Sequence, residues 1–597
     1  MTLTGRFTAK RFVTFSGFVL LFALFTAQVL YLAKTNSTVS DEVAHIGAGY
    51  SYLKYDDFRL NQEHPPLVKQ MAALPLLFID LRFPLGTQAW KDSEQWEAGR
   101  AFLFTLGNPA EEIIFKTRAA LLPVAFIMAL LIFFWARDLF GERAAFFSLF
   151  LFSLFPEMAI HASLVTTDFA PAAFYCGVFY FLTRFLHSGK IRDIYLAGLA
   201  TGLAMASKYS TFAALPLIYL FFIGYAFMSF RTPKEKKGEK SLTPEQRDHS
   251  LPLGFMILMT VFVVSHKKSF LIFSLPFIYL WLARLQPQRQ RLQAPAMKRA
   301  ASLLLILLSV AFFVILVVYF EPASWFKGMR MDPFKRFFRG WTIFRDHSTG
   351  EAHPSFLFGK ISTHGWWYYY LAAMAVKIPI PILISFCLGA VHLVSSRKIL
   401  RPEILLLLIP PVFYWVIASF INKVNIGVRH ILIVYPFLIV TAGAAFEFLG
   451  EAKFRKIRPL ALTLLGGWLL VTSARAFPNY LSYFNGLAGP LGGKENILGD
   501  SNISWGQDLK RLKIWMTANQ VPKIYRLLYF NMPEELDYYG IPYEKEDASL
   551  HFKRKDPGYY AIDMFNYQGM VLDPEFSWIQ SVKPAARVGG SILIYKF

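Results

Sequence analysis

The sequence predicts an α-helical polytopic membrane protein with about thirteen transmembrane helices and a small C-terminal α/β domain. Of its 597 residues, 55% are apolar and only 17% are charged, against about 25% charged residues in an average soluble protein. The apolar residues form long blocks, and residues 301–320 contain no charged side chain. A block of this length can cross a hydrocarbon core of about 30 Å. Together these features exclude a disordered chain, a coiled coil and a small disulfide scaffold.

The net charge is +22, from 62 Lys and Arg against 40 Asp and Glu. In a soluble protein this excess would suggest a nucleic-acid partner, but here the basic residues cluster in the connectors between apolar blocks. Positive charge in such connectors holds them on the cytoplasmic side, so no nucleic acid is expected. The two cysteines, Cys176 and Cys387, lie inside apolar blocks and imply no disulfide or metal framework.

Hydropathy predicts the individual spans and their orientation. The expected spans are 13–33, 117–136, 144–160, 169–187, 193–207, 211–230, 251–265, 268–284, 301–320, 366–392, 403–421, 430–449 and 458–474. The first is long and lacks a clear cleavage site, so we expect it to remain as an uncleaved span. With this count, the N-terminus and all basic connectors lie in the cytoplasm, and the C-terminal segment lies outside.

Four segments are then expected outside: residues 34–116, a turn near 161–168, residues 321–365, and a tail from 477 to 597. The tail combines a helical stretch at 505–516 with strand-like runs at 524–530, 558–563 and 591–597, which is typical of a small α/β unit. The sequence thus divides into a transmembrane domain at 1–476 and an extracytoplasmic domain at 477–597.

The first outer segment opens with a predicted helix that has Ser40 as its N-cap. Asp41 and Glu42 fall in the first turn, where the helix dipole favours acids whatever their function. Asp41 also shares one face with His45, among small residues that leave room for another group. An acid beside a histidine just outside a span suits a general base. The local sequence pattern leaves both interpretations of Asp41 open: an acid favoured by the helix dipole, or a general base.

A second helix is expected after Pro65 and Pro66, because proline suits the first helical turn. Its apolar stripe fits a helix in the membrane interface. Lys69 on this helix could meet a lipid phosphate, or simply extend along the apolar surface toward water.

Asp168 lies at the outer end of a predicted span, where an acid either caps a helix or belongs to a site. Because Asp41 and Asp168 are predicted on the same membrane face, they suggest a paired-carboxylate site. In such a pair, repulsion between like charges raises the proton affinity of one acid, as a general base needs.

Cationic and aromatic residues are expected on this same face. Lys208, Lys423, Arg429 and His430 could clamp a phosphate, for which arginine offers two parallel donors. Trp366 begins the run GWWYYY, whose rings could anchor a span in the interface or stack on a sugar. The histidines form no common metal motif, and we find no phosphate-binding loop or dinucleotide fingerprint.

Several segments carry a family resemblance. They are DEVAHIGAGYSYLKYDDFRLNQEHPPLVKQMAALPLL, VTTDFAP, SKYS, GWWYYYLAAMAVKIPIPIL, NIGVRHILIVYPFL and YLSYFNGLAGPLGG with DSNISWGQDLK. As a set they resemble the lipid-phosphate-sugar-dependent glycosyltransferases of the membrane-embedded C superfamily (GT-C), the group of protein O-mannosyltransferases and the lipid A aminoarabinose transferase. The resemblance covers most of the chain from 41 to about 510. It leads us to expect an acid where Ser504 stands, so the sequence departs from the family pattern at this position.

The resemblance implies a GT-C-like fold and an inverting transfer of a sugar from a polyprenyl-phosphate donor to an acceptor hydroxyl or amine. The reaction would take place on the extracytoplasmic face of the bacterial inner membrane. The implied residues are Asp41 as general base, Glu42 beside it, Asp168 to position or share a proton, Lys208, Arg429, His430 and Lys69 for the donor phosphate, and His45, His64 and Trp366 for the sugar and acceptor. No cofactor is required by this chemistry, although the acid pair could hold a divalent ion.

Two other functions fit parts of the pattern. A transporter or flippase of a lipid-linked sugar could use the same acids, and a cell-envelope assembly scaffold could use the tail. Transporters usually contain internal repeats and charged residues in mid-span. The sequence contains no evident repeat and its candidate acids lie at span ends, so the enzyme is favoured.

Overall fold

The computed structural model describes residues 3–231, 294–320, 333–349 and 353–597. The expected spans at 251–265 and 268–284 lie outside the described residues. The helices are α1 Leu3–Thr35, α2 Ser40–Tyr55, α3 Leu67–Ala73, α4 Gln88–Lys91, α5 Gln95–Arg100, α6 Ala110–Ala119, α7 Leu122–Phe140, α8 Glu142–Ser153, α9 Pro156–Ala162, α10 Phe169–Ser188, α11 Ile191–Met205, α12 Ala214–Arg231, α15 Ala294–Val318, α17 Pro333–Thr349, α18 Tyr369–Lys377, α19 Ile380–Ser395, α20 Pro402–Phe420, α21 Tyr435–Gly443, α22 Ala445–Phe448, α23 Arg458–Ala476, α24 Lys494–Ile497, α25 Leu509–Ala518, α26 Pro533–Tyr538, α27 Ala548–Arg554 and α28 Met564–Leu572.

The prediction of a polytopic helical membrane protein is confirmed. Within the described ranges, eight helices are long and apolar enough to span a membrane, or up to ten if each of two bent pairs is one span. The bent pairs are α8 with α9, at 66°, and α18 with α19, at 113°. Pro156 stands at the first break and Pro379 at the second, and proline disfavours helix both at its own position and at the residue before it.

The expected span at 193–207 corresponds to α11, which has only 15 residues. It packs against α15 through Gly198 and Gly202, where an added Cβ would lie 2.6 Å from Leu307 O and 2.6 Å from Val314 Cβ, respectively. Small residues four apart allow close contact between helices in a membrane. Its small residues therefore allow α11 to pack closely against α15.

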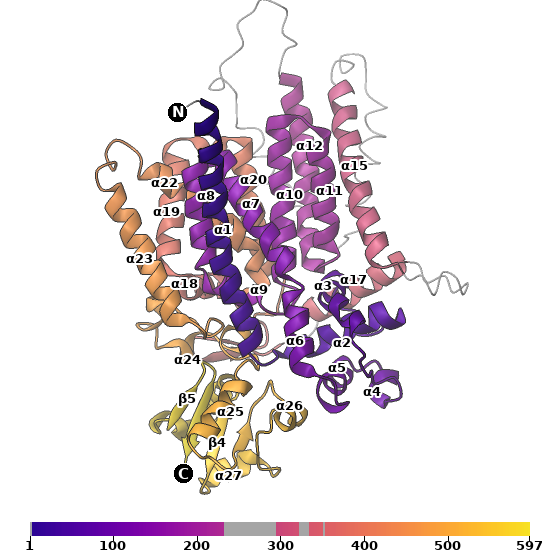
Figure 1. The fold of residues 1–597 in the computed structure, drawn as a ribbon, viewed down its shortest axis with the longest axis vertical. Helices are drawn as coiled ribbons and strands as arrows, with labels where there is room; N and C mark the ends of the chain where they lie inside the picture. Colours follow the sequence, from indigo (N-terminus) through magenta and orange to yellow (C-terminus); the bar gives the residue numbers. More distant parts are fainter. Residues whose placement is uncertain (1–2, 232–293, 321–332, 350–352) are drawn as a thin grey trace, which may run out of the picture.

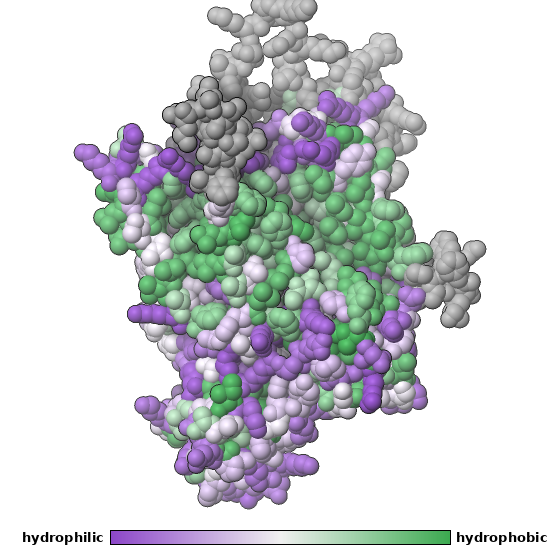
Figure 2. Space-filling model, in the orientation of Figure 1, coloured by the Kyte–Doolittle hydropathy of each residue, from purple (hydrophilic) through white to green (hydrophobic). Residues whose placement is uncertain are grey.

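The surface separates into an apolar band and two hydrophilic ends (Figure 2). The first residues of α1 and helix α22 lie at one end of the bundle, and α2, α9 and the tail lie at the other (Figure 1). The expected basic connectors that hold Arg143, Arg397 and Arg458 belong to the first end, since they adjoin α8, α19 and α23. The charge asymmetry predicted from the sequence thus matches the two ends of the bundle.

The tail contains a four-stranded sheet in the order β3-β4-β6-β5. Its strands are β3 Tyr525–Leu527, β4 Tyr559–Asp563, β5 Ala586–Val588 and β6 Ile592–Lys596, while β1 Ser355–Leu357 and β2 Lys360–Ser362 form a separate hairpin. β3 and β4 are parallel, and the other pairs are antiparallel. The predicted strand-like runs contain β3, β4 and β6, and the predicted helical stretch at 505–516 overlaps α25, which begins four residues later at Leu509.

Alternating residues of β6 enter two different cores. Ile592 and Ile594 pack with Leu509 and Leu512 of α25 on one face, while Leu593 and Tyr595 pack on the other. Successive side chains of a strand point to opposite faces, so the run of apolar residues at the chain's end indicates a strand covered on both sides. The sheet therefore packs against α25 and holds the start of this helix in place.

Candidate active site

Four charged residues from distant parts of the sequence meet at the tail end of the bundle. Arg429 Nη1 donates to Asp41 Oδ2 at 2.8 Å and lies 3.8 Å from Asp168 Oδ2. Lys208 Nζ donates to Asp168 Oδ1 at 2.6 Å. The side chain of Asp41 is 22% exposed, whereas that of Asp168 is 1% exposed. The structure thus brings together both acids and both principal cations named from the sequence.

Local structure explains how each acid reaches the cluster. The helix α2 begins at Ser40, so its N-cap is Val39 and not Ser40 as expected, and Asp41 lies in the first turn. Asp168 precedes α10, but its side chain accepts no capping hydrogen bond. Its carboxylate turns to Lys208 instead, so the cap interpretation of Asp168 does not describe this structure.

The electrostatics of Asp168 differ from the expected paired-carboxylate site. Burial alone would raise the pKa of Asp168, but Lys208 and Arg429 together hold it below its ordinary value. Arg429 lies between the two acids, so attraction to cations replaces repulsion between carboxylates. The arrangement therefore keeps Asp168 ionised.

The tail motif at 500–510 holds Arg429 in place. Arg429 Nε donates to Ser501 Oγ at 3.1 Å, and its guanidinium carbon lies 4.2 Å from the centre of the Trp505 ring. Asn502 Oδ1 accepts the backbone N–H of Val428 at 3.0 Å. Planar guanidinium groups stack well on aromatic faces. The tail thus completes a site whose other residues come from the transmembrane domain.

The same motif joins the beginning of α2. The backbone N–H of Ser40 donates to Trp505 O at 3.0 Å, and that of Ser37 donates to Gln507 O at 3.1 Å. Ser37 Oγ also donates to Gly506 O at 2.8 Å. One short segment of the tail therefore fixes both Asp41 and Arg429 relative to each other.

Asp500 is a site residue that the sequence analysis missed. It is the acid that opens the motif DSNISWGQDLK, four residues before Ser504. Asp500 adopts a left-handed backbone conformation with φ 54°, directly before the Ser501 that accepts from Arg429. Burial raises the pKa of Asp500 to about 6, although Arg429 draws it down. Asp500 is thus a carboxylate that titrates near neutral pH beside Arg429.

Glu42 lies outside this cluster, in a fully buried ion pair with Arg118. Arg118 Nε and Nη2 donate to Glu42 at 2.8 and 2.5 Å. The remaining donors of Arg118 reach the carbonyls of Ala33, Asn36 and Ser37. All five guanidinium N–H groups are therefore used, and the pair fixes the turn that leads into α2.

Glu42 also accepts two backbone N–H groups, from Val39 at 2.9 Å and from Val165 at 2.8 Å. These contacts tie the start of α2 to the turn that carries Asp168. Glu42 thus holds the first turn of α2, which carries Asp41, and does not itself join the charged cluster.

Lys69 is buried and does not reach the cluster. Its Nζ donates to Asn61 O, Asn61 Oδ1, His64 O and the Tyr52 hydroxyl at 2.7–2.9 Å. Burial lowers the pKa of Lys69 to about 7. Helix α3 reaches this position because Gly49 has no side chain: a Cβ there would lie 2.2 Å from Lys69 O. Lys69 thus fixes the first outer loop.

The histidines flank the cluster. His45 Nδ1 lies 2.8 Å from Val165 O, and the ring centres of His45 and His64 are 5.5 Å apart. Burial, together with nearby His45 and Lys69, lowers the pKa of His64 well below its ordinary value. Within the described residues, His64 Nδ1 and His430 Nε2 are buried without a hydrogen-bond partner. Such atoms are suited to receive a ligand's polar groups.

Trp366 is set apart from these residues. Its backbone N–H donates to Asn425 Oδ1 at 2.7 Å, and its side chain packs at the edge of the main hydrophobic core. Within the described residues, Trp366 makes no hydrogen bond or ring contact with the charged cluster.

The described residues offer no ready metal site. They contain no group of three His, Cys, Asp or Glu side chains placed to hold a metal ion. Arg429 Nη1 contacts both Asp41 and Asp168, so the space that a divalent ion would share between these acids holds a cation of the protein itself. The residues present do not fit a divalent ion in this arrangement.

Comparison with known proteins supports the resemblance drawn from the motifs. The family model for dolichyl-phosphate-mannose-protein mannosyltransferase matches residues 103–236. The chain is similar to these membrane glycosyltransferases. The matched segment includes Asp168 and Lys208, whereas Asp41, Arg429 and the tail motif lie outside it. Among curated proteins, none matches the sequence.

Two solved structures match this chain at low sequence identity. ArnT from Cupriavidus metallidurans, bound to undecaprenyl phosphate, is 14% identical over 96% of this chain and 97% of that chain, with a TM-score of 0.41. The archaeal oligosaccharyltransferase AglB from Archaeoglobus fulgidus, in complex with an inhibitory peptide and a dolichol-phosphate, is 13% identical over 90% of this chain and 60% of that chain, with a TM-score of 0.38.

Proposed function

We propose that this protein is an inverting glycosyltransferase that transfers a sugar from a polyprenyl-phosphate donor to an acceptor hydroxyl or amine. The observation that carries the proposal is the convergence of Asp41, Asp168, Lys208 and Arg429 at one end of the bundle. The mannosyltransferase family match over Asp168 and Lys208 adds support. Because the basic connectors adjoin the other end, we place the site on the extracytoplasmic face of the membrane, which the family resemblance implies is a bacterial inner membrane.

Binding of the donor phosphate would rearrange the ion pairs. Lys208 and Arg429 are the cations of the cluster, and a phosphate competes with Asp41 and Asp168 for them. Because Asp41 is 22% exposed and Asp168 is 1% exposed, Asp41 is the acid that an acceptor can reach. Asp168 keeps Lys208 in position, while the phosphate takes the place of Asp41 on Arg429.

The transfer then needs one proton acceptor and a stabilised leaving group. The acceptor oxygen or nitrogen attacks the anomeric carbon, the bond from that carbon to the phosphate oxygen breaks, and the acceptor proton passes to Asp41. The electron pair of the broken bond stays on the departing lipid phosphate, whose charge Lys208 and Arg429 neutralise. Attack opposite the leaving group inverts the anomeric centre.

The flippase and scaffold alternatives make different predictions. A flippase would move a lipid-linked sugar from one leaflet of a proteoliposome membrane to the other without cleaving the sugar–phosphate bond. A scaffold would depend on the tail and remain functional after loss of Asp41. Release of the lipid phosphate in the presence of an acceptor distinguishes the enzyme from both.

Arg429→Gln is expected to weaken binding of undecaprenyl phosphate by about 10- to 100-fold, since a hydrogen bond to a charged group contributes about 1.5–3 kcal/mol. Binding can be measured by microscale thermophoresis of the purified protein in detergent at pH 7.5. Arg82→Gln is the matched control, because Arg82 is an exposed arginine of the first outer loop. Equal affinities of the wild type and Arg429→Gln would remove Arg429 from the phosphate site.

Asp500→Asn is expected to bind undecaprenyl phosphate about three- to tenfold more tightly than the wild type at pH 7.5. This factor corresponds to the screened repulsion between a carboxylate and a nearby phosphate. The pKa of Asp500 is about 6, so its carboxylate is charged at pH 7.5 and opposes the phosphate. Below pH 6 it becomes neutral, and the two proteins should bind alike. Comparing their affinities at each pH cancels the titration of the ligand. A constant ratio from pH 5 to 7.5 would contradict this role.

A further inference from the structure

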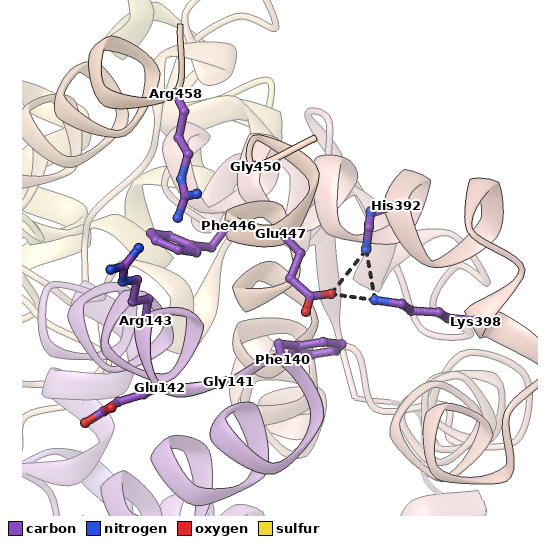
Figure 3. A pocket seen from close by; sticks show the side chains of 10 residues that line it. All are labelled: Phe140, Gly141, Glu142, Arg143, His392, Lys398, Phe446, Glu447, Gly450 and Arg458. Carbon is purple, nitrogen blue, oxygen red and sulfur yellow. Dashed lines mark hydrogen bonds and ion pairs between the residues drawn. The ribbon is translucent and has the colours of Figure 1, made fainter. Parts of the chain in front are cut away.

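A second charged cavity lies at the opposite end of the bundle from the proposed active site. It has a volume of about 430 Å³ and opens between the α7–α8 corner, the end of α19, helix α22 and the start of α23 (Figure 3). Its lining residues are Phe140, Gly141, Glu142, Arg143, His392, Lys398, Phe446, Glu447, Gly450 and Arg458. Neither the charged cluster nor the tail contributes to it.

The acids of this cavity are already engaged. Glu447 accepts from Lys398 Nζ at 2.7 Å and lies 3.2 Å from His392 Nε2. Glu142 accepts a hydrogen bond from the hydroxyl of Thr14, and its carboxylate points away from the cavity in Figure 3.

Two arginines of this cavity have no acidic partner among the described residues. Arg143 and Arg458 extend toward each other on either side of Phe446 (Figure 3), and the guanidinium carbon of Arg458 lies 3.7 Å from the centre of that ring. Among the ion pairs of the described chain, none joins Arg143 or Arg458 to an acid. Two guanidinium groups that share a cavity repel each other, so an anion between them would relieve the repulsion.

The surface beside the cavity faces lipid. Only 11% of the span formed by α23 is buried within the protein. Ile457, Leu460 and Leu464, at and near the start of this helix, are 53–62% exposed. An anion bound by the arginines would therefore lie at the start of a helix whose exposed surface is apolar and can accept acyl chains.

We propose that this cavity binds the phosphate of an anionic membrane phospholipid, with Arg143 and Arg458 as its ligands and the acyl chains along α23. Basic cavities between transmembrane helices at the positively charged membrane face recognise such headgroups. Arginine can hold a phosphate through two parallel hydrogen bonds. The site is independent of the proposed transfer reaction and would place a lipid where α8, α22 and α23 meet.

The test uses the full chain in detergent, stripped of lipid, with native mass spectrometry to follow titrated phosphatidylglycerol and phosphatidylcholine. We expect one phosphatidylglycerol to bind at least about tenfold more tightly than phosphatidylcholine, and R143Q/R458Q to lose this preference. R397Q/R401Q is the matched control: it removes two exposed arginines from the same end of the bundle, and it should change the affinity by less than about twofold.

Three results would overturn the proposal. R143Q/R458Q could keep the lipid preference, or R397Q/R401Q could lose it equally, which would indicate general surface charge. Inorganic phosphate or glycerol 3-phosphate could displace the lipid at equal concentration, which would indicate a soluble ligand.

If R143Q/R458Q does not fold, the lysine variant R143K/R458K can be used instead. It retains the charge without the paired donors and should show an intermediate preference for phosphatidylglycerol. An unchanged preference in R143K/R458K would count against arginine-specific binding.

Discussion

Asp41→Asn is expected to reduce sugar transfer by about 10²- to 10⁴-fold, the usual contribution of a general base. An amide cannot accept the proton of the acceptor. The variant should still bind undecaprenyl phosphate at least as tightly as the wild type, because Arg429 loses the carboxylate that it contacts at 2.8 Å. Transfer can be measured in proteoliposomes with a panel of labelled polyprenyl-phosphate sugars and a cell-envelope extract as the source of acceptors.

The matched control is Asp80→Asn, which removes an exposed acid from the same outer loop and should leave transfer unchanged. Full transfer by Asp41→Asn would reject the base assignment while leaving the phosphate site untouched. Loss of both transfer and phosphate binding would instead indicate that the ion pair of Asp41 and Arg429 shapes the site.

Arg118→Met is expected to destabilise the protein by about 3–5 kcal/mol, because it leaves Glu42 charged and unpaired in the interior. Both side chains are fully buried, and Arg118 also holds three backbone carbonyls before α2. The free energy of unfolding can be measured by SDS titration in mixed micelles. The double variant Arg118→Met with Glu42→Gln should recover part of the loss, since no charge then remains buried.

The control for this prediction lies on the same helix. Lys116 forms an exposed ion pair with Glu112 at 2.6 Å, and Lys116→Met should cost no more than about 0.5 kcal/mol. If Arg118→Met were as mild as Lys116→Met, the buried pair would not anchor the start of α2.

Part of the active site was predictable from the sequence alone. The positive-inside rule places Asp41 and Asp168 at one end of the bundle without any knowledge of packing, and the structure has them at that end. The phosphate candidates Lys208 and Arg429 follow from the same rule. The α/β tail was also predictable, because short runs of strand-favouring residues such as 558–563 indicate a strand locally.

The partners of the charged residues were not predictable. Glu42 and Asp41 are neighbours in sequence with the same local preference for a helix start, yet one pairs with Arg118 and the other with Arg429. Lys69 looked like a phosphate ligand, but Asn61 and His64 bind it instead. The contribution of Asp500 depends on the tail folding back beneath the bundle to reach Arg429.

The sequence by itself determined that this chain crosses a membrane many times, which of its ends is basic, and which acids and cations share the other end. Each span and its flanking charges can be recognised from the local sequence, so these properties are predictable without coordinates. Only the tertiary structure decided which charges neutralise each other and which remain for a ligand. Ion pairing depends on distances of a few ångströms between segments far apart in the sequence, such as Asp41 and Arg429, which are 388 positions apart, and no local pattern encodes such distances.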